Sequence, residues 1–174
     1  MMVVIGAYGT IKNVDSFVKR LLRFSKEENL VIQAFDATVV YGKDHLISAT
    51  IHAQRAFEQR TNATNSLALE ILLYAAGERQ IQKAIKKIGV KKGKQQIAFV
   101  FVNEMMQKKN KCIDEAVIKK LLRLFHLTSD DNVLKGNRNV LKRFGITDQE
   151  LSTIHMSNYG DLILEKVALV DIIK

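Results

Sequence analysis

The segment from Asn62 to Gly89 constrains the fold most strongly, because it joins an apolar helix to a basic one. Ser66 can cap a helix that is apolar on nearly every side from Leu67 to Tyr74, and a helix of that kind is buried. Gly77 supplies the left-handed residue that ends it. The sequence therefore predicts a buried helix against which the other elements pack.

Glu70 is the only charged residue in this apolar helix. A buried carboxylate needs a partner, and Arg60 and Arg79, at either end of the helix, are the nearest candidates in the sequence. We interpret Glu70 as a structural residue that orients a basic side chain, and not as an acid–base group.

A second helix is predicted to begin near Arg79 and to end at Gly89. Its apolar residues recur at helical spacing, so they are expected to face the core: Ile81, Ala84, Ile85 and Ile88. We expect Gly89 to end the helix in a Schellman motif, in which Val90 contacts Ile85.

The other face of this second helix is basic. At about 100° per residue, four cations fall on one stripe, and three more follow in the next loop. The stripe contains Arg79, Lys83, Lys86 and Lys87, and the loop contains Lys91, Lys92 and Lys94. The sequence thus predicts that a buried helix presents a positively charged one to solvent.

The composition agrees with a basic protein that has an acidic partner. Lysine and arginine number 27 against 18 aspartates and glutamates, which gives a net charge of +9 over 174 residues. Such a charge makes nucleic acid a plausible partner, although basic proteins without such partners exist.

We expect one domain over residues 1–174. Cys112 is the sole cysteine, and no secretory or membrane-spanning segment is visible, so a cytoplasmic protein is expected.

The remaining pattern alternates helices with β-rich runs. Four strands are expected, at Met2–Ala7, Leu30–Phe35, Thr38–Tyr41 and Gln96–Val102, the last of them apolar throughout and therefore central. Helices are expected at Val14–Phe24, Asp44–Gln59, Ile113–Phe125 and Val140–Phe144, then after Thr147, and at Asp161–Lys174. The fold class is α+β, or mixed α/β, with a small central sheet, mainly antiparallel or mixed, flanked by helices.

The spacing also predicts which faces are buried. Phe17, Val18, Leu21 and Leu22 are expected to face inward in the first helix. The last segment is apolar on more than one side, so one side can fill the core and the other can bind a partner. A helix inserted between other helices would show the same pattern.

Motifs of enzymes are weak in this chain. Gly6-Ala7-Tyr8-Gly9 and Lys92-Gly93-Lys94 lack the glycine spacing of dinucleotide and phosphate loops, and we interpret both as turns. His45 and His52 lack the further ligands of a zinc site and are interpreted as surface histidines. Asp130 and Asp131 could bind a cation, but adjacent carboxylates more commonly cap a turn. Cys112 lacks a base beside it in the sequence that would make it a nucleophile.

Two segments carry a resemblance to a known family. The first is Ser66-Leu67, Glu70, Leu72-Leu73, Gly77, Gln80-Ile81, Ala84-Ile85-Lys86 and Gly89, followed by an apolar strand, and the second is Leu164-Glu165-Lys166-Val167-Ala168-Leu169. This sequence resembles the smallest accessory subunit of the KEOPS complex, the family of the kinase-binding protein TPRKB. KEOPS makes threonylcarbamoyladenosine in transfer RNA, and its transferase chemistry belongs to another subunit.

The resemblance implies a non-catalytic adaptor without a cofactor or a metal. It implies that the chain binds and stimulates the small atypical kinase, or ATPase, of KEOPS, contacts the transferase subunit indirectly, and helps to recruit tRNA by its 3′ CCA end. The residues expected to bind tRNA are Arg55, Arg60, Arg79, Gln80, Lys83, Lys86 and Lys87. Those expected to bind the kinase are Leu164, Val167, Val170 and Ile173.

A small metal-dependent enzyme that acts on nucleic acid is the alternative hypothesis, with Asp130, Asp131 or the histidines as metal or acid–base groups. The two hypotheses differ in a simple measurement. An adaptor binds tRNA without metal-dependent cleavage or modification of it.

Overall fold

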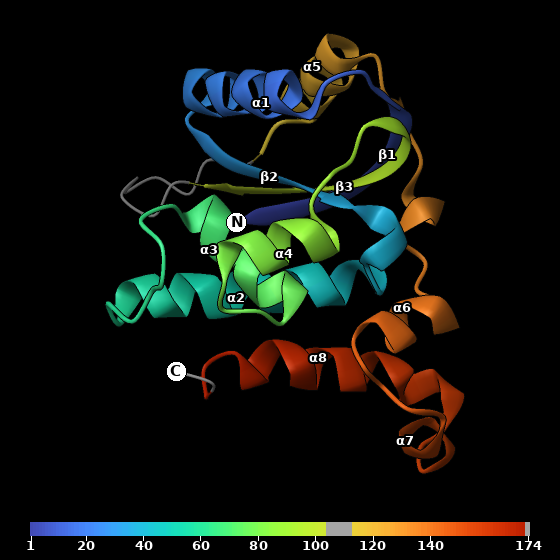
Figure 1. Cartoon of the computed structure of the whole chain (residues 1–174). Helices are drawn as coiled ribbons and strands as arrows, with labels where there is room; N and C mark the ends of the chain where they lie inside the picture. The colour runs from blue at the N-terminus through green and yellow to red at the C-terminus, as the bar shows by residue number, and fades with distance from the viewer. Residues whose placement is uncertain (104–112, 173–174) are drawn as a thin grey trace.

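The computed structural model describes residues 1–103 and 113–172, and within them four strands form one antiparallel sheet (Figure 1). The strands are β1 (Met2–Ile11), β2 (Leu30–Asp36), β3 (Gly93–Asn103) and β4 (Thr128–Ser129). Their order across the sheet is β2-β3-β1-β4. The predicted class, a small sheet flanked by helices, is confirmed.

The central position of β3 follows from its composition. Ile97 to Val102 are all buried, because helices cover both faces of the sheet there. β3 pairs with β1 from Gly93 opposite Ile11 to Val102 opposite Met2, and with β2 on its other side. The prediction of a central strand at this position is confirmed.

β1 is longer than predicted because Gly6 and Gly9 lie within the strand and not in a turn. A side chain at Gly6 would collide with the backbone carbonyl of Asp130, and one at Gly9 would collide with the side chain of Leu127. The glycines therefore allow the segment around β4 to approach the strand closely. The interpretation of Gly6 to Gly9 as a turn is wrong.

The predicted strand Thr38–Tyr41 is also wrong. Ala37–Val39 instead form a short 3₁₀ helix, η1. The Asp36 carboxylate accepts hydrogen bonds from the Thr38 N–H at 3.0 Å and from the Thr38 hydroxyl at 2.6 Å, which turns the chain at the end of β2. The fourth strand is β4, whose Thr128 pairs with Tyr8 of β1.

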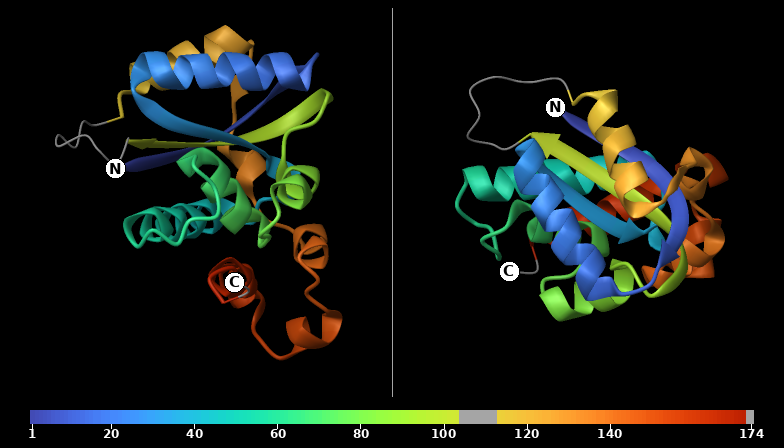
Figure 2. Two further views of the ribbon diagram at one scale, coloured as in Figure 1. Left: turned by 60° about the vertical axis from the view of Figure 1, so that its left-hand side comes forward. Right: turned by 90° about the horizontal axis from the view of Figure 1, so that it is seen from above.

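Helices cover the two faces of the sheet in separate layers (Figures 1 and 2). On one face lie α1 (Val14–Glu28) and α5 (Glu115–Phe125). The other face is covered by α2 (Gly42–Glu58) and α3 (Leu67–Ala76), with α4 (Ile81–Ile88) beside α3. In α1 the buried residues are Phe17, Leu21 and Phe24, whereas Val18 and Leu22 are exposed, contrary to the prediction.

The C-terminal region forms a further tier on the far side of α2 (Figure 1). A 3₁₀ helix, η2 (Asp131–Leu134), first lies against β1 and β3. The tier itself contains α6 (Arg138–Arg143), α7 (Asp148–Ser152), a 3₁₀ helix, η3 (Met156–Asn158), and α8 (Tyr159–Leu169). The Ile146 N–H donates to the Leu141 carbonyl around Gly145, whose φ is 72°. Thr147 and Glu150 form a capping box at the start of α7. α8 ends earlier than the predicted helix, at Leu169.

Candidate functional site

α3 is the buried helix that the sequence predicted. The Ser66 hydroxyl accepts the Leu69 N–H, and Gly77 ends the helix in the left-handed conformation at a φ of 65°. Every residue from Leu67 to Ala76 except Leu69 is buried. α3 therefore fixes the positions of α2, α4 and α8, which all contact it.

The buried Glu70 carboxylate binds backbone N–H groups and not an arginine. It accepts the Ala63 N–H at 3.0 Å and the Thr64 N–H and hydroxyl at 2.9 and 3.0 Å. The prediction that Arg60 or Arg79 is its partner is wrong, because the loop before α3 folds back over the first turn of the helix. Glu70 is structural, as interpreted, but it orders this loop instead of a basic side chain.

α4 presents a mixed surface of lysines and isoleucines. Lys83 and Lys86 are exposed, as predicted for the basic stripe. Ala84 and Ile88 are buried, but Ile81 and Ile85 are 38% and 49% exposed, so only part of the predicted apolar face reaches the core. The outer surface of α4 therefore offers two cations beside two aliphatic side chains.

The end of α4 differs from the predicted Schellman motif. Gly89 is extended, with a φ of −68° and a ψ of 152°, and not left-handed. A side chain there would collide with the Ile85 backbone, including its carbonyl oxygen, at 2.5 Å. Glycine is required at this position because the chain leaves the helix close to its last turn.

Lys87 and Arg79 are held by contacts within the chain. The Lys87 ammonium donates to the Ala76 carbonyl at 2.7 Å and lies 4.1 Å from the centre of the Phe144 ring. Its side chain is 22% exposed, and burial lowers its pKa. Arg79 donates to the Val170 carbonyl at 3.1 Å. The predicted stripe of four exposed cations is thus reduced to Lys83 and Lys86.

The other residues expected to bind tRNA lie at the surface. Arg55 is exposed on α2, Arg60 in the loop after α2, and Gln80 immediately before α4. Arg60 has a φ of 57°, and the Thr61 N–H donates to the Ala56 carbonyl, so a left-handed residue ends α2. A non-glycine residue in this left-handed conformation lowers the stability of the fold by about 1 kcal/mol.

The kinase-binding residues expected on α8 divide between core and surface. Val167 and Val170 are buried in the core that α2 and α3 share, so the expectation that they face a partner is wrong. Leu164 is half-buried, and Ile172 is 75% exposed just after the helix. Ile173 lies outside the described residues. The outer side of α8, opposite α2, is the part that remains available (Figure 1).

Asp171 ties the end of α8 to α2 and α3, which the sequence did not reveal. Its carboxylate accepts a hydrogen bond from the Tyr74 hydroxyl and lies 2.8 Å from Nδ1 of His52. The His52 and Tyr74 rings stack with their centres 5.6 Å apart. Burial and the Asp171 carboxylate raise the pKa of Tyr74. These contacts, with Arg79 on Val170, hold the C-terminal segment against the molecule.

The candidate catalytic residues have structural roles in the described part of the chain. His45 is fully buried, and the interpretation of it as a surface histidine is wrong. Its Nε2 donates to the Ala75 carbonyl at 2.8 Å while its Nδ1 accepts the Tyr41 N–H, and burial lowers its pKa to about 4. Asp130 caps η2 and Asp131 binds the Gly6 N–H and Lys43.

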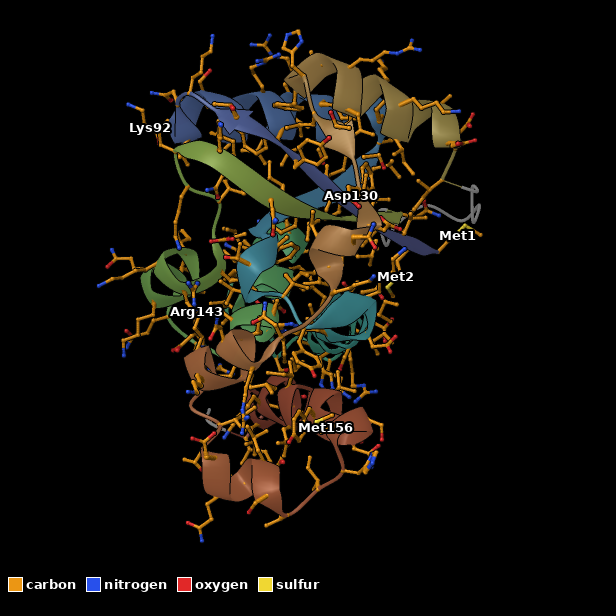
Figure 3. All side chains as sticks on the ribbon, turned by 90° about the vertical axis from the view of Figure 1, so that its right-hand side faces the viewer. Met1, Met2, Lys92, Asp130, Arg143 and Met156 are labelled. Carbon is orange, nitrogen blue, oxygen red and sulfur yellow. The ribbon has the colours of Figure 1, made fainter. Side chains whose placement is uncertain are left out.

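Among residues 1–103 and 113–172, no three histidine, cysteine, aspartate or glutamate side chains gather in the way that a metal site needs. Figure 3 shows the surface on which Asp130 and Lys92 lie. Cys112 lies outside the described residues.

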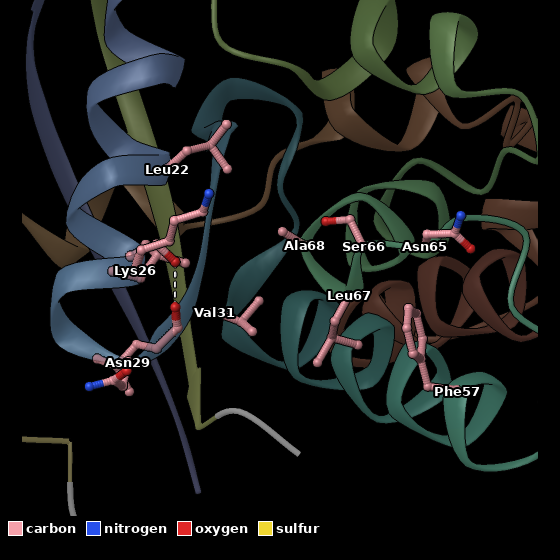
Figure 4. A pocket seen from close by; sticks show the side chains of 12 residues that line it. Leu22, Lys26, Asn29, Val31, Phe57, Asn65, Ser66, Leu67 and Ala68 are labelled. Atoms are coloured by element: carbon pink, nitrogen blue, oxygen red, sulfur yellow. Dashed lines mark hydrogen bonds between the residues drawn. The ribbon is translucent and has the colours of Figure 1, made fainter. Parts of the chain in front are cut away.

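A cavity of about 660 Å³ opens between α1, β2 and the start of α3 (Figure 4). Leu22, Val31, Phe57 and Leu67 give it apolar walls, and among the described residues that line it Lys26 is the one cation. Sequence reasoning missed this cavity because it depends on how the loop before α3 lies against β2.

No helix in the described ranges is both long and apolar enough to cross a membrane. The family model described as kinase binding protein CGI-121 matches residues 8–171 of the chain. The regulatory protein Cgi121 of Methanocaldococcus jannaschii is 30% identical over 146 residues, which are 83% of this chain and 86% of that protein. The KEOPS complex subunit Cgi121 of Pyrococcus abyssi is 41% identical over 68 residues, 38% of this chain and 40% of that protein.

Proposed function

The chain belongs to the CGI-121 family of kinase-binding proteins, and from this premise we propose that it is a kinase-binding regulatory subunit of a KEOPS complex that also helps to recruit tRNA. The observation that carries the proposal is the family match, which extends over residues 8–171 and so includes both segments of the resemblance. A regulatory role agrees with the structural roles of His45, Asp130 and Asp131.

The kinase is proposed to bind the outer side of α8. Leu164 and Ala168 lie four residues apart there and are half-buried, and Ile172 follows with 75% of its surface exposed. Aliphatic side chains of this kind serve as anchors in a groove on a partner. Val167 and Val170 support the helix from the core and do not contact the kinase.

Substitution tests this assignment. Leu164→Arg places a charge in the proposed interface, so the Kd for the kinase is expected to rise at least about tenfold, equivalent to about 1.4 kcal/mol, with an unchanged melting temperature. Val170→Arg places the charge in the core and is expected to prevent folding. A folded Leu164→Arg protein with full kinase affinity would move the interface elsewhere.

The tRNA is proposed to bind the outer surface of α4. Lys83 and Lys86 provide cations for phosphates, and the exposed Ile81 and Ile85 beside them provide aliphatic contacts for unpaired bases. Gln80 precedes this surface at the start of α4, and Arg55 and Arg60 extend the set of exposed cations. Arg79 and Lys87 position this helix through their contacts with Val170 and Ala76.

Two comparisons test the tRNA proposal. Removal of the 3′ CCA end is expected to weaken binding far more than a change in the anticodon, because a single-stranded end suits this surface. Lys83→Glu/Lys86→Glu is expected to lower the affinity and to flatten its salt dependence by roughly one unit for each phosphate that the variant no longer binds. The matched control is Lys119→Glu/Arg123→Glu on α5, which lies across the sheet. Equal reductions of affinity in the two double variants would refute a site on α4.

A further inference from the structure

One end of the sheet extends beyond the helices that cover it. Tyr8 and Thr10 follow Val4 at intervals of two on β1, so they share its face, the face that packs on α2 and α3. Gln96 pairs with Tyr8 and Lys94 pairs with Thr10, which places all four side chains on that face. All four residues are exposed, and Tyr8 is 47% exposed. We call these four residues the sheet-end platform.

The platform borders a cleft of about 730 Å³, which Asp36, Thr38 and Gln95 also line. The Asp36 carboxylate is already satisfied, because it accepts hydrogen bonds from Thr38 and lies 3.2 Å from the Lys91 ammonium. The negative charge of Asp36 is therefore balanced without Lys94. The remaining groups in the cleft are an aromatic ring, amides, hydroxyls and a lysine.

Three side-chain groups of the platform have no partner within the described ranges, whereas the Thr38 hydroxyl and the Gln95 amide are hydrogen-bonded. No hydrogen bond or ion pair from residues 1–103 or 113–172 engages the Tyr8 hydroxyl, the Gln96 amide or the Lys94 ammonium, and no ring contact engages Tyr8. An exposed aromatic ring on a sheet, beside amides and a cation, is the arrangement on which unpaired bases stack while their phosphates meet lysine.

The platform is connected to the proposed tRNA surface. Only Gly89 to Lys92 separate the end of α4 from the start of β3, and four residues span at most about 15 Å. Lys92 lies at this junction, on the same side of the molecule as α4 (Figure 3). Lys92 and Lys94 therefore continue the positive charge of Lys83 and Lys86 towards Tyr8, whereas Lys91 is paired with Asp36.

We propose that the sheet-end platform binds an unpaired nucleotide of the RNA held by α4, with the base stacked on Tyr8 and hydrogen-bonded by Gln96, and its phosphate bound by Lys94. This assignment rests on the proposed function, because it takes RNA as the ligand of α4. The platform would be a second RNA contact, on the sheet, in addition to the contact proposed on α4.

The experiment measures the affinity of the whole chain for tRNA with an intact CCA end and for a single-stranded RNA hexamer. Tyr8→Ala removes the stacking ring, so the Kd for both RNAs is expected to rise about 5- to 100-fold. Tyr8→Phe keeps the ring and is expected to bind within about twofold of the parent. Lys94→Ala is expected to weaken binding and to reduce the salt slope by about one, and Lys119→Ala on α5 serves as its control.

The outcomes separate the two proposals. If Tyr8→Ala binds both RNAs like the parent while Lys83→Glu/Lys86→Glu loses affinity, the platform is refuted and the α4 site stands. If Tyr8→Phe loses as much affinity as Tyr8→Ala, stacking is not the interaction and the assignment of Tyr8 is refuted. Binding of an acidic peptide with the same dependence on Tyr8, in a protein that binds neither RNA, would overturn the nucleotide assignment and the tRNA proposal together.

Discussion

Replacement of Glu70 by alanine tests whether one buried carboxylate orders the loop that joins α2 to α3. The carboxylate accepts two backbone N–H groups and one hydroxyl from Ala63 and Thr64, at distances of 2.9 to 3.1 Å. Thr64 is buried, so its N–H has no access to water once the carboxylate is removed.

The expected cost follows from these hydrogen bonds. A hydrogen bond to a charged group contributes about 1.5–3 kcal/mol, and a buried donor left without an acceptor costs about 1–3 kcal/mol. Because the bonds share one carboxylate they do not add fully, so we expect Glu70→Ala to lower the free energy of unfolding by about 3–5 kcal/mol. For a chain of this size that corresponds to roughly 10 °C in melting temperature. Glu70→Gln keeps one acceptor oxygen and is expected to lose about half as much stability.

The assay is urea unfolding followed by far-ultraviolet circular dichroism, with the slope m unchanged so that the midpoint reports stability. Glu115→Gln on α5 is the control, because this carboxylate is 78% exposed and its change is expected to stay within about 0.5 kcal/mol. A loss below about 1 kcal/mol in Glu70→Ala would show that the Glu70 carboxylate does not order this loop. If Arg60→Ala lowered the free energy of unfolding by the same amount, Arg60 would be the partner of Glu70, as the sequence suggested.

Three further substitutions test the roles of single residues in stability or in RNA binding. His45 is neutral in the folded chain because burial lowers its pKa from 6.5 to about 4. The unfolded state therefore binds more protons between these pH values, and the free energy of unfolding is expected to fall by up to about 3 kcal/mol as the pH drops from 6.5 to 4. Denaturant titrations of His45→Gln should lack this part of the pH dependence. Arg60→Gly relieves a left-handed residue, so the free energy of unfolding is expected to stay level or to rise by up to about 1 kcal/mol while tRNA affinity falls in a filter-binding assay. Lys87→Met is expected to lower the free energy of unfolding by about 1–2 kcal/mol in urea and to leave tRNA affinity unchanged, because the Lys87 ammonium binds the Ala76 carbonyl. Reduced tRNA affinity in a folded Lys87→Met protein would show that Lys87 binds RNA.

Local signals in the sequence were sufficient for the elements that local interactions determine. α3 could be predicted with both of its ends, because Ser66 and Gly77 act on their own helix. β3 could be predicted as central because all of its residues from Ile97 to Val102 are apolar. The capping box of Thr147 and Glu150 is also a local interaction, because both residues belong to the first turn of α7.

Residues whose role depends on distant segments could not be placed in this way. Gly6 resembles a turn residue until Asp130, from the C-terminal half of the chain, is brought against it. Lys87 falls on the basic stripe by helical angle, but Phe144 of the C-terminal region covers that side of α4. Val170 is an aliphatic residue near the end of the chain, which suited a partner interface, but it is buried because α8 packs on α2 and α3.

Association with the small atypical kinase of the KEOPS complex from the same organism tests whether this chain is a kinase-binding subunit of that complex. Isothermal titration calorimetry of the two purified, folded proteins should give saturable binding. Leu164→Arg is expected to weaken that binding at least about tenfold. No detectable heat or complex with both proteins folded at concentrations of about 100 μM, where a Kd of about 1 μM or better would be saturated, would contradict a kinase-binding role.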